Sequence, residues 1–132
     1  SNMEIHRFMD KRRGADLLKL KALFARSHFL LVPSMAECFG IVYAEASSMA
    51  LPSLARDTGG VKSAVHNDRN GYALSKEASA EAYAAIIERL WHDRDAYADL
   101  CRSAFKEFRE RLNWTQVGRQ LSTILREAAN ET

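Results

Sequence analysis

The chain has 132 residues, the length of a single domain that can bury a hydrophobic core. Apolar residues make up 47% and charged residues 27%, a balance typical of a globular protein. The net charge is +2, and the single basic run, Lys11-Arg12-Arg13, is too short to indicate a nucleic-acid or membrane-surface partner. We interpret that run as a solvated loop.

Alternation and helical spacing of apolar residues predict a parallel, Rossmann-like sheet of about four short strands flanked by helices. In chain order, we expect strand 4–9, helix 15–26, strand 28–32, helix 40–50, strand 53–55, helix 61–65, strand 72–74 and helices 78–91, 93–111 and 114–129. Turns are expected at 57–60 and 67–71. Ser75 or Ser79 should cap the first of the three final helices, and Asn113 the last.

The two cysteines, Cys38 and Cys101, are too few for a disulfide framework or a metal cluster, and they fit a reducing, cytoplasmic setting. No apolar run approaches the ~20 residues that span a bilayer, and the start has no secretory signal pattern. Ser1-Asn2 before Met3 is typical of a remnant left by tag removal, so we expect the domain to occupy residues 3–132.

Two glutamates lie where the second predicted strand gives way to its helix: Glu37 on the loop and Glu45 on an early helical turn. In an open α/β sheet this loop lies at the carboxyl end of a strand, where ligands bind. An unpaired buried carboxylate is costly, so Glu45 should face a cleft or a hydrogen-bond partner, and its two oxygens suit the hydroxyls of a ribose. Alternatively, Glu45 is an exposed surface residue, and Glu37 only complements the helix dipole.

The start of the same helix is a candidate anion site. Its first amide N–H groups have no partner within the helix, and Gly40 lets a phosphate approach the backbone closely. The alternative is that Gly40 only accommodates a tight turn between strand and helix.

The order and spacing of Glu37, Gly40 and Glu45 resemble those in the retaining GT-B glycosyltransferases with a Glu-x7-Glu motif (glycosyl transferases group 1). Asn113-Trp114 and the amphipathic helix after it resemble that family's closing segment, and the similarity runs from about Ile5 onward. It implies half of a GT-B fold: an incomplete C-terminal nucleotide-sugar-binding domain with a helical C-terminal segment. The other residues that carry the resemblance are Pro33-Ser34, Phe39, Ala46, Pro52, Gly59-Gly60-Val61 and Gly71.

The resemblance also implies residue roles. Glu45 matches the glutamate that binds the ribose hydroxyls, and the amides of Gly40 and Ile41 match those that hold the diphosphate. Glu37 matches the acid that contacts the donor sugar near the reacting carbon, and Phe39 matches a bulky packing residue beside it. The segment 9–11 would lie where the family binds the base. The family uses no metal, and we assign surface or packing roles to the histidines, His6, His28, His66 and His92.

The implied reaction transfers a glycosyl group from a nucleotide diphosphate sugar to an acceptor with retention, as in polysaccharide or glycolipid biosynthesis, and requires no cofactor. The family also has an arginine and a lysine that clamp the diphosphate, and an N-terminal acceptor domain, which this chain lacks. We therefore expect the isolated chain, whether from a shortened gene or an expressed piece, to be inactive. Ala50 replaces the family's usual glycine, and Ser63 a frequent glutamate.

Without the missing strands, segment 4–9 should pair with the sheet edge at 28–32 or with another chain, and an exposed edge favours a dimer. Membrane contact would be indirect, through a lipid-linked acceptor. Two alternatives remain: a non-catalytic nucleotide or nucleotide-sugar binding module that works with a partner chain, and a sugar-nucleotide epimerase, which the Phe39 to Ala46 pattern favours less.

Overall fold

The computed structural model describes residues 2–130 and has the predicted α/β class. Three parallel strands form one sheet in the order β1-β2-β3: β1 (Leu30–Val32), β2 (Ser53–Arg56) and β3 (Gly71–Leu74). The helices in the described part of the chain are α1 (Gly14–Arg26), α2 (Ile41–Ser48), α3 (Val61–Ala64), α4 (Ala80–His92), α5 (Arg94–Glu110) and α6 (Trp114–Asn130).

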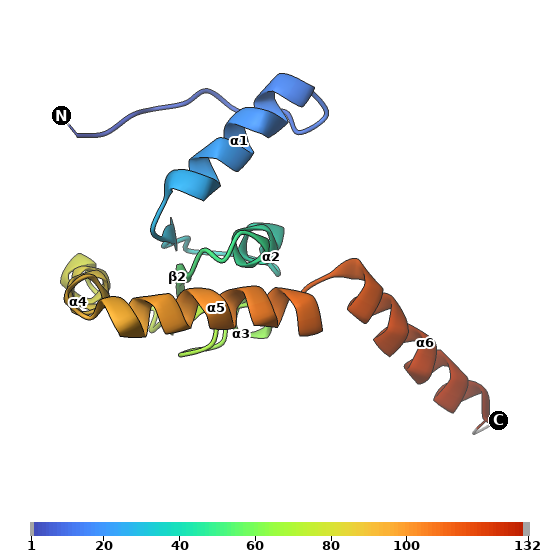
Figure 1. Cartoon of the computed structure of the whole chain (residues 1–132). Coiled ribbons are helices and arrows are strands. Elements are labelled where there is room, and N and C mark those ends of the chain that lie inside the picture. The colour runs from blue at the N-terminus through green and yellow to red at the C-terminus, as the bar shows by residue number, and fades with distance from the viewer. Residues whose placement is uncertain (1, 131–132) are drawn as a thin grey trace.

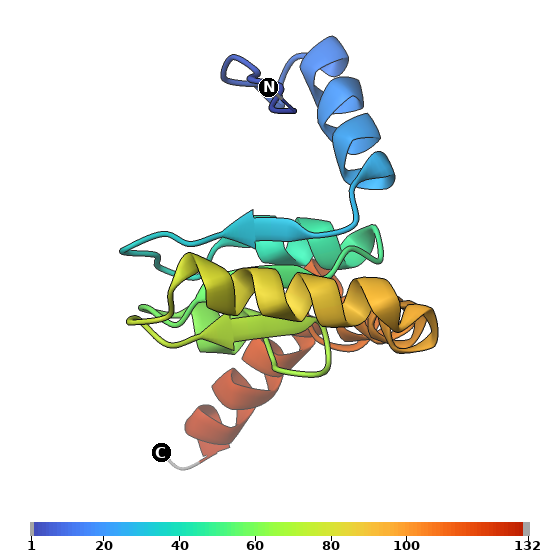
Figure 2. The same cartoon turned by 90° about the vertical axis from the view of Figure 1, so that its left-hand side faces the viewer.

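Strand β2 lies in the middle of the sheet, and its first three residues, Ser53 to Ala55, are buried. Continuous burial is expected of a parallel strand that is covered on both faces. Helices α2 and α4 lie on opposite faces of the sheet, and α5 runs across from the α4 side to the α2 side (Figures 1 and 2). The Tyr97 hydroxyl of α5 donates to the carbonyl of His28 (2.9 Å), just before β1, so this helix passes the amino-terminal edge of the sheet.

The core between the sheet and helices α2 and α3 is small and apolar. Its buried members are Tyr43, Ala55, Val61, Ala64 and Val65. The turn before β3 is tied to this core by a buried amide: the side-chain carbonyl of Asn70 accepts from the amide of His66 (2.8 Å), and its NH2 group donates to the Ala64 carbonyl (2.9 Å) and the Ser47 hydroxyl (3.2 Å). The amino-terminal end of β3 is therefore fixed to α2 and α3.

The strand predicted at residues 4–9 is wrong, and the sheet has three strands rather than four. This segment is irregular, does not pair with β1, and exposes 86% of Phe8. Its polar groups bind α1 instead: Arg7 pairs with Asp16 (3.0 Å), and Glu4 pairs with Arg26 (3.0 Å). A strand needs ladder hydrogen bonds between its backbone and that of a neighbouring strand. Ion pairs between side chains hold this segment on α1 and supply no such ladder.

The caps of the final helices were predicted in part. The Asn113 side chain accepts a hydrogen bond from the amide of Gln116 (3.0 Å), which confirms it as the cap of α6. Ser79 occupies the N-cap position of α4, as predicted, but its side chain makes no capping hydrogen bond.

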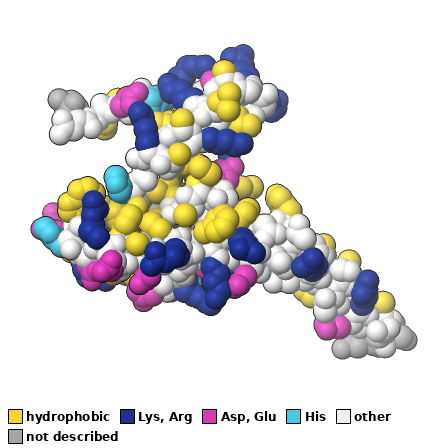
Figure 3. Space-filling model, in the orientation of Figure 1, with side chains coloured by type: hydrophobic (Ala, Val, Ile, Leu, Met, Phe, Trp, Pro, Cys, Tyr) yellow, Lys and Arg dark blue, Asp and Glu magenta, His cyan; other side chains and the backbone are white. Residues whose placement is uncertain are grey.

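Helices α1 and α6 project from the body of the molecule (Figure 1). Lys and Arg side chains gather over α1, and hydrophobic side chains gather on the body below it (Figure 3). Helix α6 has no buried residue. Among residues 2–130, no helix is both long and apolar enough to cross a membrane.

Candidate functional site

The candidate site lies at the carboxyl edge of the sheet, where the loop after β1 and the turn after β2 are bound together. The Thr58 hydroxyl donates to the carbonyl of Met35 (3.2 Å), and the amide of Gly60 donates to the carbonyl of Cys38 (2.6 Å). A Cβ on Gly59, where φ is +54°, would lie 1.8 Å from the carbonyl oxygen of Glu37. The backbone of the turn after β2 thus packs directly against the backbone of the Glu37 loop and holds that loop in place.

Gly40 begins α2 at this edge in a left-handed conformation, with φ +74°. A Cβ at this position would lie 2.3 Å from Cε2 of the buried Tyr43 ring, so no other residue fits without displacing the ring. No side chain caps α2. The first amides of the helix, including that of the exposed Ile41, are therefore available to an anion, and the helix dipole favours one there.

Glu37 lies on the loop between β1 and α2 and is half-buried. One carboxylate oxygen accepts from the amide of Cys38 (3.2 Å). Burial raises the pKa of Tyr43, and the nearby Glu37 charge raises it further. The Glu37 loop leads directly into Gly40, so the carboxylate lies on the same edge as the α2 amides.

Glu45 faces α1 rather than the edge. Its Oε1 pairs with the Lys11 ammonium, and its buried Oε2 has no hydrogen-bond partner within the described residues. The side chain is 31% exposed, and a pocket of about 100 Å³ opens beside it, lined by Leu17, Leu20, Lys21, Phe24, Ser48 and Met49. The prediction that Glu45 faces a cleft or a partner is confirmed. The run 11–13 is an exposed turn, as predicted, and its Lys11 also pairs with Glu45.

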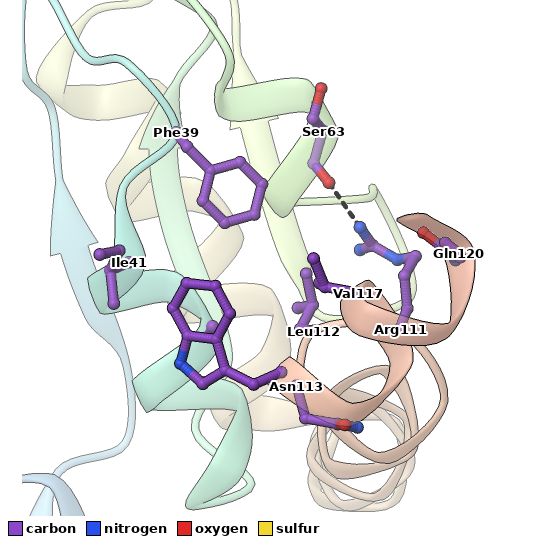
Figure 4. Close-up of a pocket in the computed structure, with 10 residues that line it drawn as sticks. Phe39, Ile41, Ser63, Arg111, Leu112, Asn113, Val117 and Gln120 are labelled. Carbon is purple, nitrogen blue, oxygen red and sulfur yellow. Dashed lines mark hydrogen bonds between the residues drawn. The ribbon is translucent and has the colours of Figure 1, made fainter. Parts of the chain in front are cut away.

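A larger pocket, of about 460 Å³, lies on the other side of the start of α2 (Figure 4). Phe39 and Ile41 form one wall, and Leu112, Val117 and Arg111, from the α5–α6 junction, form the opposite wall. Ala44, Ser63, Asn113, Trp114 and Gln120 complete the lining. The predicted donor residues are therefore divided: Phe39 and Ile41 face this pocket, and Glu45 faces the pocket beside α1.

Arg111 is a pocket residue that sequence reasoning missed. Its guanidinium donates to the carbonyl of Ala64 (3.2 Å) and that of Ser63 (2.5 Å), while Nε pairs with the buried Glu107 (2.8 Å). Burial lowers the pKa of His66, which also lies near Glu107, and the Arg111 charge lowers it further. No motif marks this cluster in the sequence, since its members come from α3, α5 and the residues just after each of these two helices.

Among residues 2–130, no group of three or more His, Cys, Asp or Glu side chains is arranged to hold a metal ion. The groups described above at this edge include amides, the Glu37 carboxylate and apolar walls. Such a set can bind an anionic, hydroxyl-bearing ligand.

The family model "Glycosyl transferases group 1" matches residues 16–107 of this chain, a stretch that includes β1, α2 and both glutamates. The chain belongs to the group 1 glycosyl transferases. The matched stretch ends within α5, so the closing helix α6 lies beyond it.

Curated relatives carry the name D-inositol 3-phosphate glycosyltransferase. The protein of Salinispora tropica is 30% identical over 125 residues, which cover 95% of this chain and 25% of the relative. The protein of Corynebacterium glutamicum is 29% identical over 126 residues, which cover 95% of this chain and 29% of the relative. The chain thus spans less than a third of these proteins.

Solved structures share the fold. Anabaena HepE in complex with UDP superposes with a TM-score of 0.71 at 24% identity, over 86% of this chain and 30% of that one. Sucrose-phosphate synthase from Thermosynechococcus elongatus gives a TM-score of 0.70 at 24% identity, over 86% and 28%. The HepE complex with UDP-glucose gives 0.67 at 25% identity, over 80% and 29%. These neighbours are GT-B glycosyltransferases, so the predicted half of a GT-B fold is confirmed.

Proposed function

We propose that this chain is the donor-binding part of a retaining glycosyltransferase that takes a nucleotide diphosphate sugar. The observation that carries the proposal is the start of α2 at the carboxyl edge, where Gly40 in a left-handed conformation leaves the first helical amides uncapped beside Glu37. The diphosphate would bind the amides at Gly40 and Ile41, and Glu37 would contact the sugar, with Phe39 packing beside it. UDP and UDP-glucose in the HepE complexes support this ligand class.

Glu45 would bind the ribose hydroxyls. Its Oε2 is a buried acceptor without a partner among the described residues, and a hydroxyl donor would satisfy it. The ribose would then share the carboxylate with Lys11, which holds the other oxygen. In this arrangement the nucleoside lies over the α1 side of α2, and the diphosphate turns around the start of the helix.

We further propose that residues 3–132 are an incomplete C-terminal donor domain and that the acceptor-binding part lies outside them. The chain covers only 25% to 30% of the relatives and neighbours described above, which supports this division. Effective transfer requires that donor and acceptor are held together in a reactive geometry. The isolated chain should therefore bind the donor without turning it over. A non-catalytic binding module would behave in the same way.

Isothermal titration with UDP tests the donor site. Wild type should bind UDP, and Glu45→Gln should weaken the binding of both UDP and uridine by roughly tenfold, because a charged acceptor is lost. Glu88→Gln, an exposed glutamate on α4, is the matched control and should bind as wild type does. No UDP binding by wild type, or unchanged binding by Glu45→Gln, would contradict the proposal. Incubation with UDP-glucose should give neither glycosyl transfer nor donor hydrolysis.

A further inference from the structure

Arg56 is the last residue of the central strand β2, so it lies at the carboxyl edge of the sheet. In the parallel register it stands opposite Leu74, the last residue of β3, while Ala55 stands opposite Val32, the last residue of β1. All three strands therefore end together, and their loops gather at one side of the molecule (Figure 2). In sheets of this kind, ligands bind in the crevice outside these ends.

The guanidinium of Arg56 reaches the loop after β1, which carries Glu37 and leads into Gly40. Its Nη1 contacts the sulfur of Met35, and the Met35 carbonyl accepts from the hydroxyl of Thr58 in the turn that follows Arg56. The same turn and loop are joined again by the hydrogen bond from Gly60 to Cys38. Arg56 is thus part of the connected edge that presents the α2 amides.

The cation of Arg56 has no oxygen partner in the part of the chain that the structure describes. Its Nε is buried without a hydrogen bond, and its contact is a thioether, which is a weak acceptor. The neighbouring Asp57 is engaged by Lys62 (2.6 Å), so it does not neutralise the guanidinium. The half-buried Arg111, by contrast, has a carboxylate and two carbonyls as partners.

An arginine held this way is costly to the fold unless a ligand supplies the missing acceptor. Guanidinium N–H groups form a planar fork that matches two oxygens of a phosphate, and such charge-assisted pairs are strong. The α2 amides offer only partial positive charge to a diphosphate. A full cation on the same edge would complete the neutralisation. Met35, which is 80% exposed, leaves room for its side chain to move aside.

We propose that the Arg56 guanidinium binds a phosphoryl oxygen of the donor's diphosphate and so supplies a cation to the ligand from the end of β2. This inference rests on the proposed donor-binding function. It assigns to Arg56 a share of the affinity that depends on the phosphates and not on the nucleoside.

The test compares the binding of UDP and uridine to the full chain by isothermal titration. The dissociation constant for uridine divided by that for UDP measures the contribution of the phosphates. Arg56→Met should reduce this ratio by roughly 10- to 100-fold and leave uridine binding unchanged. Arg56→Lys keeps a charge but loses the fork, so it should restore part of the ratio and remain sensitive to salt. Thermal unfolding of each variant establishes that it is folded.

Arg94→Met is the matched control. Arg94 lies over the Trp91 ring (4.3 Å to the centroid) at the start of α5, the helix whose Tyr97 contacts the amino end of β1. Removing this cation from the opposite edge should leave both affinities unchanged.

The possible results separate the two proposals. If wild type binds UDP and Arg56→Met keeps the wild-type ratio, or weakens UDP and uridine equally, the role of Arg56 is refuted and the donor site stands. If folded wild type binds no UDP, the donor site and the role of Arg56 both fall. If Arg56→Met does not fold, the ratio measured for Arg56→Lys decides. The inference is refuted if the Arg56→Lys ratio equals that of wild type and does not change with salt.

Discussion

Gly40→Ala is the substitution that most directly tests the geometry of the site. A Cβ at this position would lie 2.3 Å from Cε2 and 2.6 Å from Cδ2 of Tyr43, whose ring is fully buried. Alanine in the left-handed conformation costs about 1 to 2 kcal/mol, and an overpacked core costs about 1 to 3 kcal/mol more. The free energy of unfolding should therefore fall by about 2 to 5 kcal/mol.

Urea denaturation followed by far-ultraviolet circular dichroism measures this loss. Gly118→Ala is the control, because Gly118 lies within α6 and nothing is within 4 Å of a Cβ built there. The same substitution should stabilise that helix by roughly 0.5 to 1 kcal/mol, from propensity alone. Equal urea midpoints for Gly40→Ala and wild type would show that Gly40 is not held against Tyr43, and the account of the α2 start would fail.

Other substitutions test the fold around the site. Ala50 has φ +55°, so Ala50→Gly should raise the free energy of unfolding by about 0.5 to 1 kcal/mol. This is the cost of alanine in the left-handed conformation minus the cost of the greater flexibility of glycine in the unfolded chain. A lower urea midpoint would contradict this prediction. Asn70→Ala removes three hydrogen bonds of a fully buried side chain and should cost roughly 2 to 4 kcal/mol by the same assay. An unchanged midpoint would show that the amide is not needed. The pKa of His66 is lowered from 6.5 by burial and the Arg111 charge, so the unfolded chain binds its proton more readily. The stability that neutral His66 contributes is present above pH 6.5 and lost as the pH falls. Urea midpoints measured from pH 7.5 to 5.5 should therefore decline less for His66→Gln than for wild type. Equal declines would refute the lowered pKa of His66.

Each well-predicted element has a local physical cause. Helical spacing of apolar residues and the prolines at 33 and 52 indicated the helices and two of the strands to within a few residues. The cap at Asn113 was predictable because its side chain reaches an amide three residues away. Gly40 was also recognised from local sequence, because a glycine between a strand and a helix indicates an unusual backbone conformation.

Segment 4–9 shows where local patterns fail. Its weak alternation fits a strand, but a strand exists only if a neighbour supplies hydrogen bonds, and α1 engages the segment through ion pairs instead. Ala50 shows a related limit. The resemblance marked it as a mild departure from glycine, and the backbone in fact places it at positive φ.

By itself, the sequence determined the α/β class, the family resemblance and the place of the candidate site after the first strand of the sheet, because each depends on spacing along the chain. The tertiary structure decided which groups meet. Lys11 lies 34 residues from Glu45, and Arg111 lies 48 residues from Ser63. Only packing could show that α2 separates Glu45 from Phe39 and Ile41, because the direction of a side chain depends on how its helix lies against its neighbours.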